Sequence, residues 1–556
     1  MVDIRKVANR KRVGFISACI FILIILDFLL NLFWNPVFLN KITYNLNADS
    51  SVFAYGGKLV VEGKLPYRDF WDHKPPAVFY VDAFIIRLMG TSQWSFWWSN
   101  VIWLALTTIV LFLILRKLSG TLAAILASGV FLVSLMYPSY YAGGNMPETY
   151  GVLPQVLTIG ASYLLFSSEK MRWAFITGLL TAIAFLFKQT EISLGIGAFL
   201  AVGVLGLRTR DWRKEIKYLA LFLFGATIPL ILIGLLWALA GAVGYLWDAV
   251  IVYNFIYING SMTLLSLQQT FRILFAELPL MPVTIMTLGA VLVFAIKSRS
   301  LVLPHVAGLP GARSMFVPNE ETGRQYSFLA VFLALPFGVI FVALGGRNYL
   351  HYFISLLPLY ATACAYLFMQ LSHQHSFVPK YRIIRPISIF ILAALGIVFL
   401  SNAYLVEKPQ MGVRNSLSNL FSGEVPVSPS AQYILDHTRP DQSILIWGNN
   451  IGLYLETGRR NPSRYLYPQP LFLPNSGTES RFDQFFKDIQ RNPPELIFGL
   501  DATNSDIPSI NVPESDLCPG CIPEAVRGMQ QLKVFINEYY VLVPINETIN
   551  VYQRAH

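Results

Sequence analysis

Long apolar runs are the feature of this 556-residue sequence that most constrains its fold. The hydrocarbon core of a bilayer is about 30 Å thick, so a helix needs about 20 apolar residues to cross it. Runs of that length, bounded by charged or turn residues, recur throughout residues 1–405. Charged residues form only 13% of the chain, against about 25% in soluble domains, which excludes an ordinary water-soluble enzyme. The sequence therefore predicts a polytopic α-helical membrane protein.

About eleven transmembrane helices are predicted. They are expected at residues 14–34, 93–115, 119–137, 148–167, 173–190, 192–207, 218–240, 278–296, 326–344, 350–371 and 386–405. With a cytoplasmic amino terminus, 21 Lys and Arg residues fall on the cytoplasmic side and 9 on the opposite side. Because cytoplasmic loops are enriched in Lys and Arg, we predict this orientation, in the plasma (inner) membrane.

The charge of the chain divides it near residue 405. Residues 1–405 carry 30 basic and 16 acidic side chains, whereas residues 406–556 carry 12 and 16. The positive charge thus lies in the apolar part, and no nucleic-acid partner is predicted. An odd number of spans places residues 406–556 outside the cytoplasm, and their strand-like runs at 443–447, 495–498 and 540–543 are typical of an α/β domain. We predict a membrane domain of residues 1–405 and a C-terminal extracytoplasmic α/β domain of residues 406–556.

The first outside loop, residues 35–92, is too long to be a simple connector. It contains Asp49, two expected interfacial helices at 50–62 and 77–89, and between them the segment Tyr67-Arg-Asp-Phe-Trp-Asp-His-Lys-Pro-Pro76. Helices that lie in the headgroup layer hold a loop against the membrane surface, where the headgroup of a lipid-borne substrate arrives. This loop is therefore the leading candidate for an active site.

Four motifs carry a resemblance to a known family: Asp49 just beyond the first span, the segment 67–76, Phe187-Lys-Gln189, and Gly345-Gly-Arg-Asn-Tyr-Leu-His-Tyr352. Together they resemble the bacterial glycosyltransferase family 39, which is related to the protein O-mannosyltransferases and to the aminoarabinose transferase of lipid A. The resemblance implies the membrane-embedded C-type glycosyltransferase fold and a polyprenyl-phosphate sugar as donor.

The same resemblance implies roles for individual residues. Asp49 corresponds to the acid that acts on the acceptor, and Lys74 to a lysine near the donor phosphate. A carboxylate can take the proton of an attacking hydroxyl, and cations stabilise the charge that the departing phosphate gains. Arg347 and His351 are further candidates for phosphate binding, and they share one helical face if the tenth helix begins near them.

Five more residues are additional site candidates: Arg68, Asp69, Asp72, His73 and Glu148. Simpler roles stay open for the main candidates. Asp49 is also suited to cap the helix that follows it. Lys74 could extend its side chain to lipid headgroups, and Glu148 could stabilise the start of a helix, where a carboxylate is favoured by the helix dipole.

Other polar residues leave chemistry open. Lys188 and Glu191, three residues apart, are expected to form a structural ion pair. The lone Cys518-Pro-Gly-Cys521 motif favours a local disulfide or two free thiols over a metal site. A divalent metal at the site is left open. Ser50 follows Asp49 where protein mannosyltransferases have the Glu of a paired Asp-Glu motif, and this departure argues against a protein acceptor. A lipid, a glycan and a protein are all kept as possible acceptors.

The sequence thus predicts a glycosyltransferase that moves a monosaccharide from a polyprenyl-phosphate sugar to an acceptor on the extracytoplasmic side, with Asp49 as base and with inversion, because a single displacement suffices. A transporter or lipid flippase is the alternative from another class. A transporter concentrates polar groups at mid-membrane in broken helices, whereas here they gather in the first loop and at span ends. An oligosaccharyltransferase or oligosaccharide ligase is the second alternative.

Overall fold

The structure is a computed structural model that describes most of the chain. It describes residues 4–34, 48–141, 144–168, 170–209, 212–261, 263–277, 279–298, 319–373, 427–472, 477–500, 507–510, 521–546 and 549–555. All structural statements below concern these residues.

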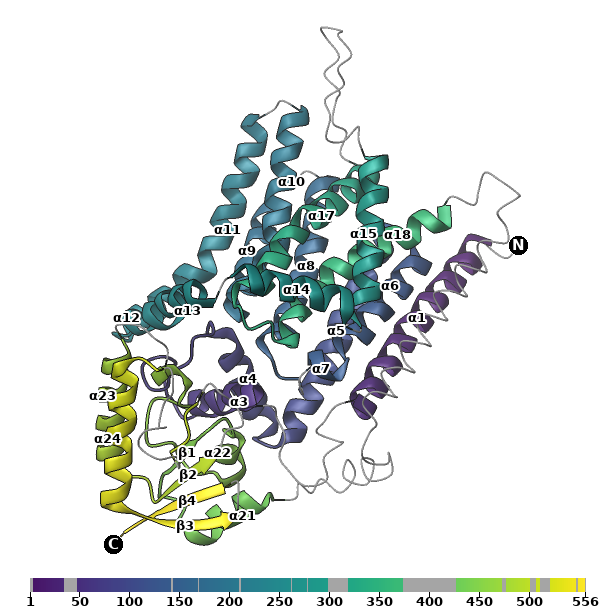
Figure 1. Ribbon diagram of the computed structural model, residues 1–556. Coiled ribbons are helices and arrows are strands. Elements are labelled where there is room, and N and C mark those ends of the chain that lie inside the picture. The colour runs from purple at the N-terminus through teal and green to yellow at the C-terminus, as the bar shows by residue number, and fades with distance from the viewer. Residues whose placement is uncertain are drawn as a thin grey trace.

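Helices dominate the part before residue 374 (Figure 1). In chain order the α-helices are α1 (Ile4–Trp34), α3 (Ala48–Val61), α4 (Ala77–Met89), α5 (Gln93–Ser119), α6 (Thr121–Leu135), α7 (Pro138–Tyr141), α8 (Pro147–Ser168), α9 (Met171–Phe187), α10 (Ser193–Thr209), α11 (Trp212–Leu239), α12 (Val243–Trp247), α13 (Tyr253–Ser261), α14 (Leu264–Ala276), α15 (Leu280–Lys297), α17 (Glu320–Leu344) and α18 (Leu357–His373). Shorter turns join some of them: the 3₁₀ turns η1 (Gln189–Ile192) and η3 (Leu350–Leu356), and the π-helical turn η2 (Asp248–Val252).

Eight helices within the described residues are long and apolar enough to cross a membrane. They coincide with eight of the eleven predicted spans, those that begin at 14, 93, 148, 192, 218, 278, 326 and 350. The predicted spans 119–137 and 173–190 correspond to the shorter apolar helices α6 and α9. The last predicted span, 386–405, lies outside the described residues, so the total of eleven stays a prediction.

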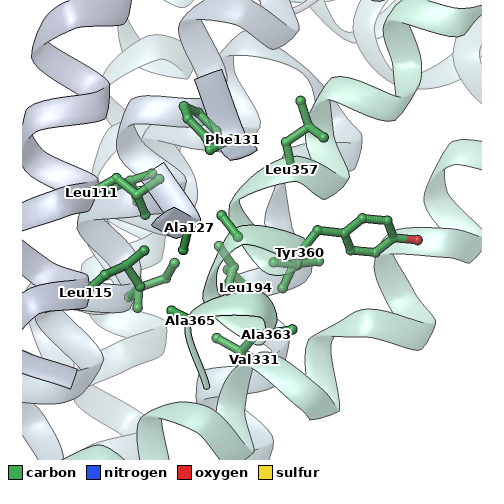
Figure 2. Packing of buried hydrophobic residues seen from close by; sticks show 14 of the residues in the cluster. Leu111, Leu115, Ala127, Phe131, Leu194, Val331, Leu357, Tyr360, Ala363 and Ala365 are labelled. Carbon is green, nitrogen blue, oxygen red and sulfur yellow. The ribbon is translucent and has the colours of Figure 1, made fainter. Parts of the chain in front are cut away.

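A large apolar cluster fills much of the interior of the bundle (Figure 2). Leu111 and Leu115 of α5 face Ala127 and Phe131 of α6, and Leu357 of α18 completes this layer. Small residues among the large ones let helix backbones approach closely, which is the usual basis of helix association where no water must be expelled.

Two glycines set the crossing of α9 and α11. A Cβ atom on Gly178 would overlap the carbonyl oxygen of Phe222, and one on Gly225 would overlap the carbonyl oxygen of Phe175. Each glycine therefore packs against the backbone of the other helix. This crossing brings the end of α9, which precedes Lys188, into a defined position in the bundle.

The first loop and the C-terminal residues lie at the same end of the bundle. The expected helices of the loop are present as α3 and α4, which lie between the bundle and a β-sheet (Figure 1). Tyr55 of α3 stacks on Tyr454 with ring centroids 4.9 Å apart, and its hydroxyl accepts a hydrogen bond from the backbone N–H of Asn461. The loop is thus packed on two sides.

The C-terminal residues form a four-stranded sheet in the order β1-β2-β4-β3. Its strands are β1 (Ile444–Trp447), β2 (Leu496–Leu500), β3 (Tyr540–Asn546) and β4 (Ile549–Arg554), and only β1 and β2 pair in parallel. The three predicted strands correspond to β1, β2 and β3. The predicted boundary at 405 and 406 lies outside the described residues and stays a prediction.

Both faces of this sheet are covered. Alternate side chains of a strand point to opposite faces. Ile444 and Ile446 pack with the helices α21 (Pro429–His437) and α22 (Gly452–Thr457), whereas Leu445 and Trp447 pack with α23 (Thr478–Arg491) and α24 (Pro523–Tyr539). Cys521, just before α24, is disulfide-bonded, and Cys518 lies outside the described residues.

The substitution Gly178→Ala tests the crossing of α9 and α11. We expect it to lower the free energy of unfolding by about 1–3 kcal/mol, because a packed interface must move to admit the methyl group. Thermal unfolding of the detergent-solubilised protein measures this change. Gly203→Ala in α10 is the matched control, since a Cβ atom there meets nothing within 4 Å. Equal stabilities of the two variants would contradict the proposed crossing.

Candidate functional site

Asp49 lies in the first turn of α3, where the helix dipole stabilises a carboxylate. Its side chain is 53% exposed, unlike most polar groups near it. Ser50, the next residue, is fully buried, and its hydroxyl donates to the carbonyl oxygen of Gly144, 2.6 Å away. Asp49 therefore has a fixed backbone and a carboxylate that remains accessible.

Two carboxylates flank His351. Its Nε2 atom lies 3.9 Å from Oδ2 of Asp49 and 4.0 Å from Oε1 of Glu148. The three residues belong to α3, η3 and α8, which are distant in the sequence. Glu148 lies in the first turn of α8 and also beside His351. A role in starting the helix and a role in the candidate site are therefore compatible.

Lys188 pairs with Glu148 in the interior. Its Nζ atom lies 2.5 Å from Oε1 of Glu148 and 3.4 Å from the centre of the Tyr352 ring. The side chain of Glu148 is 1% exposed and that of Lys188 10%, so each charge depends on the other.

The close ion pair of Lys188 is with Glu148 and not with the expected Glu191, although the charge of Glu191 still acts on Lys188. Lys188 has an extended backbone after the end of α9, and Glu191 lies in the 3₁₀ turn η1. The two side chains therefore lack the spacing of a continuous helix. Glu191 instead accepts hydrogen bonds from the amide of Gln155 and the hydroxyl of Ser355.

Lys74 lies in a tight turn just before α4. Its backbone N–H donates to Oδ1 of Asp72, 2.7 Å away, and its carbonyl oxygen accepts from the hydroxyl of Tyr67, also at 2.7 Å. Its Nζ atom lies 2.8 Å from Nε2 of His73. The charge of Lys74 is close enough to act on both Lys188 and His351. The loop thus brings this lysine to the group around His351.

Asp72 connects the loop to the C-terminal residues. It is buried, and Oδ2 accepts a hydrogen bond from the hydroxyl of Tyr467, 3.1 Å away. Burial raises the pKa of Asp72, while the nearby charge of Lys74 opposes this shift. Asp72 therefore shapes the turn that holds Lys74 and anchors it to a distant part of the chain.

Arg68 and Asp69 form a separate pair. Two guanidinium nitrogens of Arg68 donate to the two carboxylate oxygens of Asp69, each at 2.9 Å, and this contact lowers the pKa of Asp69. The backbone N–H of Leu65 also donates to Asp69, at 2.8 Å. No contact of either residue with Asp49, Glu148 or His351 is found among the described residues.

Arg347 does not share a helical face with His351, so that expectation is wrong. Helix α17 ends before Gly345, and Gly346 and Asn348 both have positive φ values, of 63° and 49°. The chain therefore turns between Arg347 and the 3₁₀ turn that carries His351. The exposed Arg347 is nevertheless close enough for its charge to act on Tyr253.

Asn145, which the sequence analysis missed, holds the surrounding segments together. It is fully buried, and its side-chain N–H groups donate to the carbonyl oxygen of Ser50 and to Oδ2 of Asp82, at 3.2 and 3.0 Å. Its side-chain oxygen accepts from the hydroxyl of Tyr150, 2.7 Å away. Its backbone has a positive φ of 53°, which Asn tolerates better than most residues. In the sequence, the preceding Gly143-Gly144 pair was the only indication of a special backbone conformation at this point.

This network spans both flanking acids. Ser50 directly follows Asp49, and Asn145 precedes Glu148 by three residues. The hydrogen bond between Asn145 and Ser50 therefore sets the spacing of the two acids that flank His351. Among the described residues, no group of three or more His, Cys, Asp or Glu side chains is arranged to hold a metal ion.

The chain resembles known proteins in part of its sequence and in its fold. The model of the family described as dolichyl-phosphate-mannose-protein mannosyltransferase matches residues 73–237. No curated protein matches the chain by sequence. The match begins at His73 and includes Lys74, Glu148 and Lys188.

Solved structures resemble the chain over nearly its whole length. ArnT from Cupriavidus metallidurans, bound to undecaprenyl phosphate, has a TM-score of 0.56 and 11% identity over 97% of this chain and 98% of that one. The archaeal oligosaccharyltransferase AglB from Archaeoglobus fulgidus has a TM-score of 0.45 and 12% identity, over 98% of this chain and 75% of that one. The resemblance predicted from the motifs is thus confirmed: the chain has the fold of the membrane-embedded C-type glycosyltransferases.

Proposed function

We propose that this protein is an integral membrane glycosyltransferase that moves a monosaccharide from a polyprenyl-phosphate sugar to an acceptor. The observation that carries the proposal is the half-exposed carboxylate of Asp49, 3.9 Å from His351, beside a group that includes Lys74 and Lys188. An accessible acid beside one buried and one partly buried lysine suits a reaction in which a hydroxyl loses its proton while a phosphate gains charge.

The reaction is a single displacement. The acceptor oxygen forms a bond to the anomeric carbon, the bond from that carbon to the phosphate oxygen breaks, and the phosphate leaves with the electron pair. Asp49 takes the proton of the acceptor hydroxyl. The configuration of the sugar is inverted, because the acceptor attacks the face opposite the leaving group. A donor and an acceptor held at one surface react with the entropic advantage of proximity.

Positive charges and hydrogen-bond donors stabilise the departing phosphate in this proposal. Lys74, Arg347 and His351 are the proposed phosphate-binding residues, and Lys188 adds a charge that Glu148 already balances. Support comes from the shared fold of ArnT from Cupriavidus metallidurans, whose structure contains undecaprenyl phosphate. Arg68 and Asp69 are assigned to the structure of the loop, because their charges are satisfied by each other.

We place the site on the extracytoplasmic side of the plasma membrane, with the amino terminus in the cytoplasm. The excess of basic residues in the alternate loops supports this orientation. The packing of α3 and of the 67–76 segment against the C-terminal residues supports a common side for both. The C-terminal domain is then available to bind the acceptor.

An oligosaccharyltransferase is the second candidate, because AglB has related architecture in a longer chain. Mass spectrometry of the lipid carrier before and after the reaction separates the candidates. Loss of one sugar supports the proposal, and loss of an oligosaccharide supports the second candidate. A carrier that crosses the bilayer with its sugar intact supports a flippase. Comparison of surface glycans from cells with and without the gene identifies the sugar and the acceptor.

Asp49→Asn tests the proposed base. We expect it to lower the rate of sugar transfer by about 10²–10⁴-fold, because the amide cannot accept the proton. The measurement is transfer of radiolabelled sugar from a polyprenyl phosphate in membranes. Glu62→Gln is the matched control, since Glu62 follows the other end of the same helix and pairs with Lys58. Transfer at the wild-type rate by the Asp49 variant would remove the proposed role.

Lys188→Met tests the buried ion pair that supports the site. We expect it to lower the free energy of unfolding by about 3–5 kcal/mol, because the charge of Glu148 then stays buried without its partner. The double variant Lys188→Met/Glu148→Gln should recover part of this loss, since no charge remains unpaired. Thermal unfolding of the wild type, Lys188→Met, Glu148→Gln and the double variant in detergent measures the coupling. Additive effects of the two substitutions would show that the pair is not coupled.

A further inference from the structure

His73 joins two segments that are far apart in the sequence. Its Nδ1 atom lies 3.0 Å from Oδ1 of Asn254, and its Nε2 atom lies 2.8 Å from Nζ of Lys74. Asn254 belongs to α13, whereas His73 and Lys74 belong to the first loop. The imidazole therefore connects helix α13 with Lys74, the lysine proposed to bind the donor phosphate.

The hydrogen-bond partners of Asn254 decide where the imidazole carries its proton. The side-chain N–H groups of Asn254 donate to the carbonyl oxygens of His73 and Val250, at 2.8 and 3.0 Å. Its Oδ1 atom is then the acceptor that faces His73, so Nδ1 of His73 must donate. Nε2 keeps its lone pair in the neutral ring and can accept from the ammonium group of Lys74.

We propose that His73 is a neutral positioning residue, protonated on Nδ1, whose Nε2 atom aims the ammonium group of Lys74 at the donor phosphate. This inference rests on the proposed function, because it assumes that Lys74 binds that phosphate. Asn254 sets the tautomer, and the amide of Gln189 supports the loop by donating to the carbonyl oxygen of His73, 3.4 Å away.

A second cation at His73 is the competing possibility, and its surroundings oppose it. The charged groups that act on the ring are Lys74 and Lys188, both positive. The rings of Tyr253 and Tyr257 lie 5.4 and 5.8 Å from it. Burial and the charge of Lys74 hold the pKa of His73 well below its usual value. The neutral ring thus agrees with the geometry.

Holding Lys74 in place has a chemical advantage. A lysine side chain has a flexible stem and loses rotational freedom when it binds a phosphate. The contacts of His73 restrict the ammonium group before the donor arrives, which lowers the entropic cost of binding. The same contact leaves the other N–H groups of the ammonium available to phosphate oxygens.

The affinity of the full-length protein for undecaprenyl phosphate in detergent tests this inference. We expect Lys74→Met to weaken binding roughly ten- to hundredfold, the range for a lost hydrogen bond to a charged group. Lys58→Met is its control, because Lys58 lies on α3 and pairs with Glu62. His73→Phe keeps a ring beside the two tyrosines but loses both nitrogens, and should weaken binding several-fold. His73→Gln can still accept from Lys74 and should bind nearly as the wild type does.

The outcomes separate the two proposals. Unchanged binding by Lys74→Met overturns the proposed phosphate site and this inference with it. Weak binding by Lys74→Met together with wild-type binding by His73→Phe overturns the inference alone. Nitrogen NMR of the imidazoles of the wild-type protein at pH 6 tests the tautomer without a binding measurement, with the His73 signal identified by its loss in His73→Gln. A ring protonated on both nitrogens, or on Nε2 alone, also overturns the inference.

Discussion

The pairing of buried charges is the constraint on which the rest of the structure depends. A charge removed from water is costly unless an opposite charge and hydrogen bonds compensate it. Glu148 and Lys188 meet this requirement together, and His351 and Asp49 extend the group toward solvent. Their backbones come from α8, the end of α9, η3 and α3, so the group exists only when the helices are packed correctly. Helix packing and site geometry are therefore one problem in this protein.

Polar contacts then connect the site to the rest of the molecule in two directions. Toward the bundle, Asn145 ties the start of α3 to α4 and α8. Toward the sheet, Tyr467 binds Asp72, and Arg464 donates to the backbone carbonyl of Tyr67. The first loop is therefore held from both sides, in addition to the apolar contacts between α3 and α4. The contacts of Ser50 with the bundle hold Asp49 beside His351. The turn that contains Lys74 is held by Asp72, which also binds Tyr467 of the C-terminal residues.

Much of the architecture could be predicted from local patterns. A run of about 20 apolar residues has few alternatives to a transmembrane helix, because its backbone must satisfy its own hydrogen bonds in lipid. The strands at 443–447 and 495–498 were also visible as short β-branched and aromatic runs between turn residues. Lys188 forms its close ion pair with Glu148 rather than with the expected Glu191, because the expectation assumed a continuous helix and α9 ends before Lys188. The shared helical face of Arg347 and His351 failed for the same reason, at Gly346 and Asn348.

The sequence by itself determined the helical membrane architecture. It also predicted a site in the first loop, and its motifs, through a family resemblance, made Asp49, Lys74 and His351 the candidates. These features follow from composition, periodicity and short motifs, which are properties of neighbouring residues. Only the tertiary structure decided that Glu148 pairs with Lys188, that Asn145 spaces the two acids, and that His73 faces both Asn254 and Lys74. His73 and Lys74 are adjacent in the sequence, whereas His73 and Asn254 are 181 positions apart. Sequence distance therefore does not predict these contacts. Each buried polar group needs a hydrogen-bond partner, and only the fold decides which groups are near enough to serve.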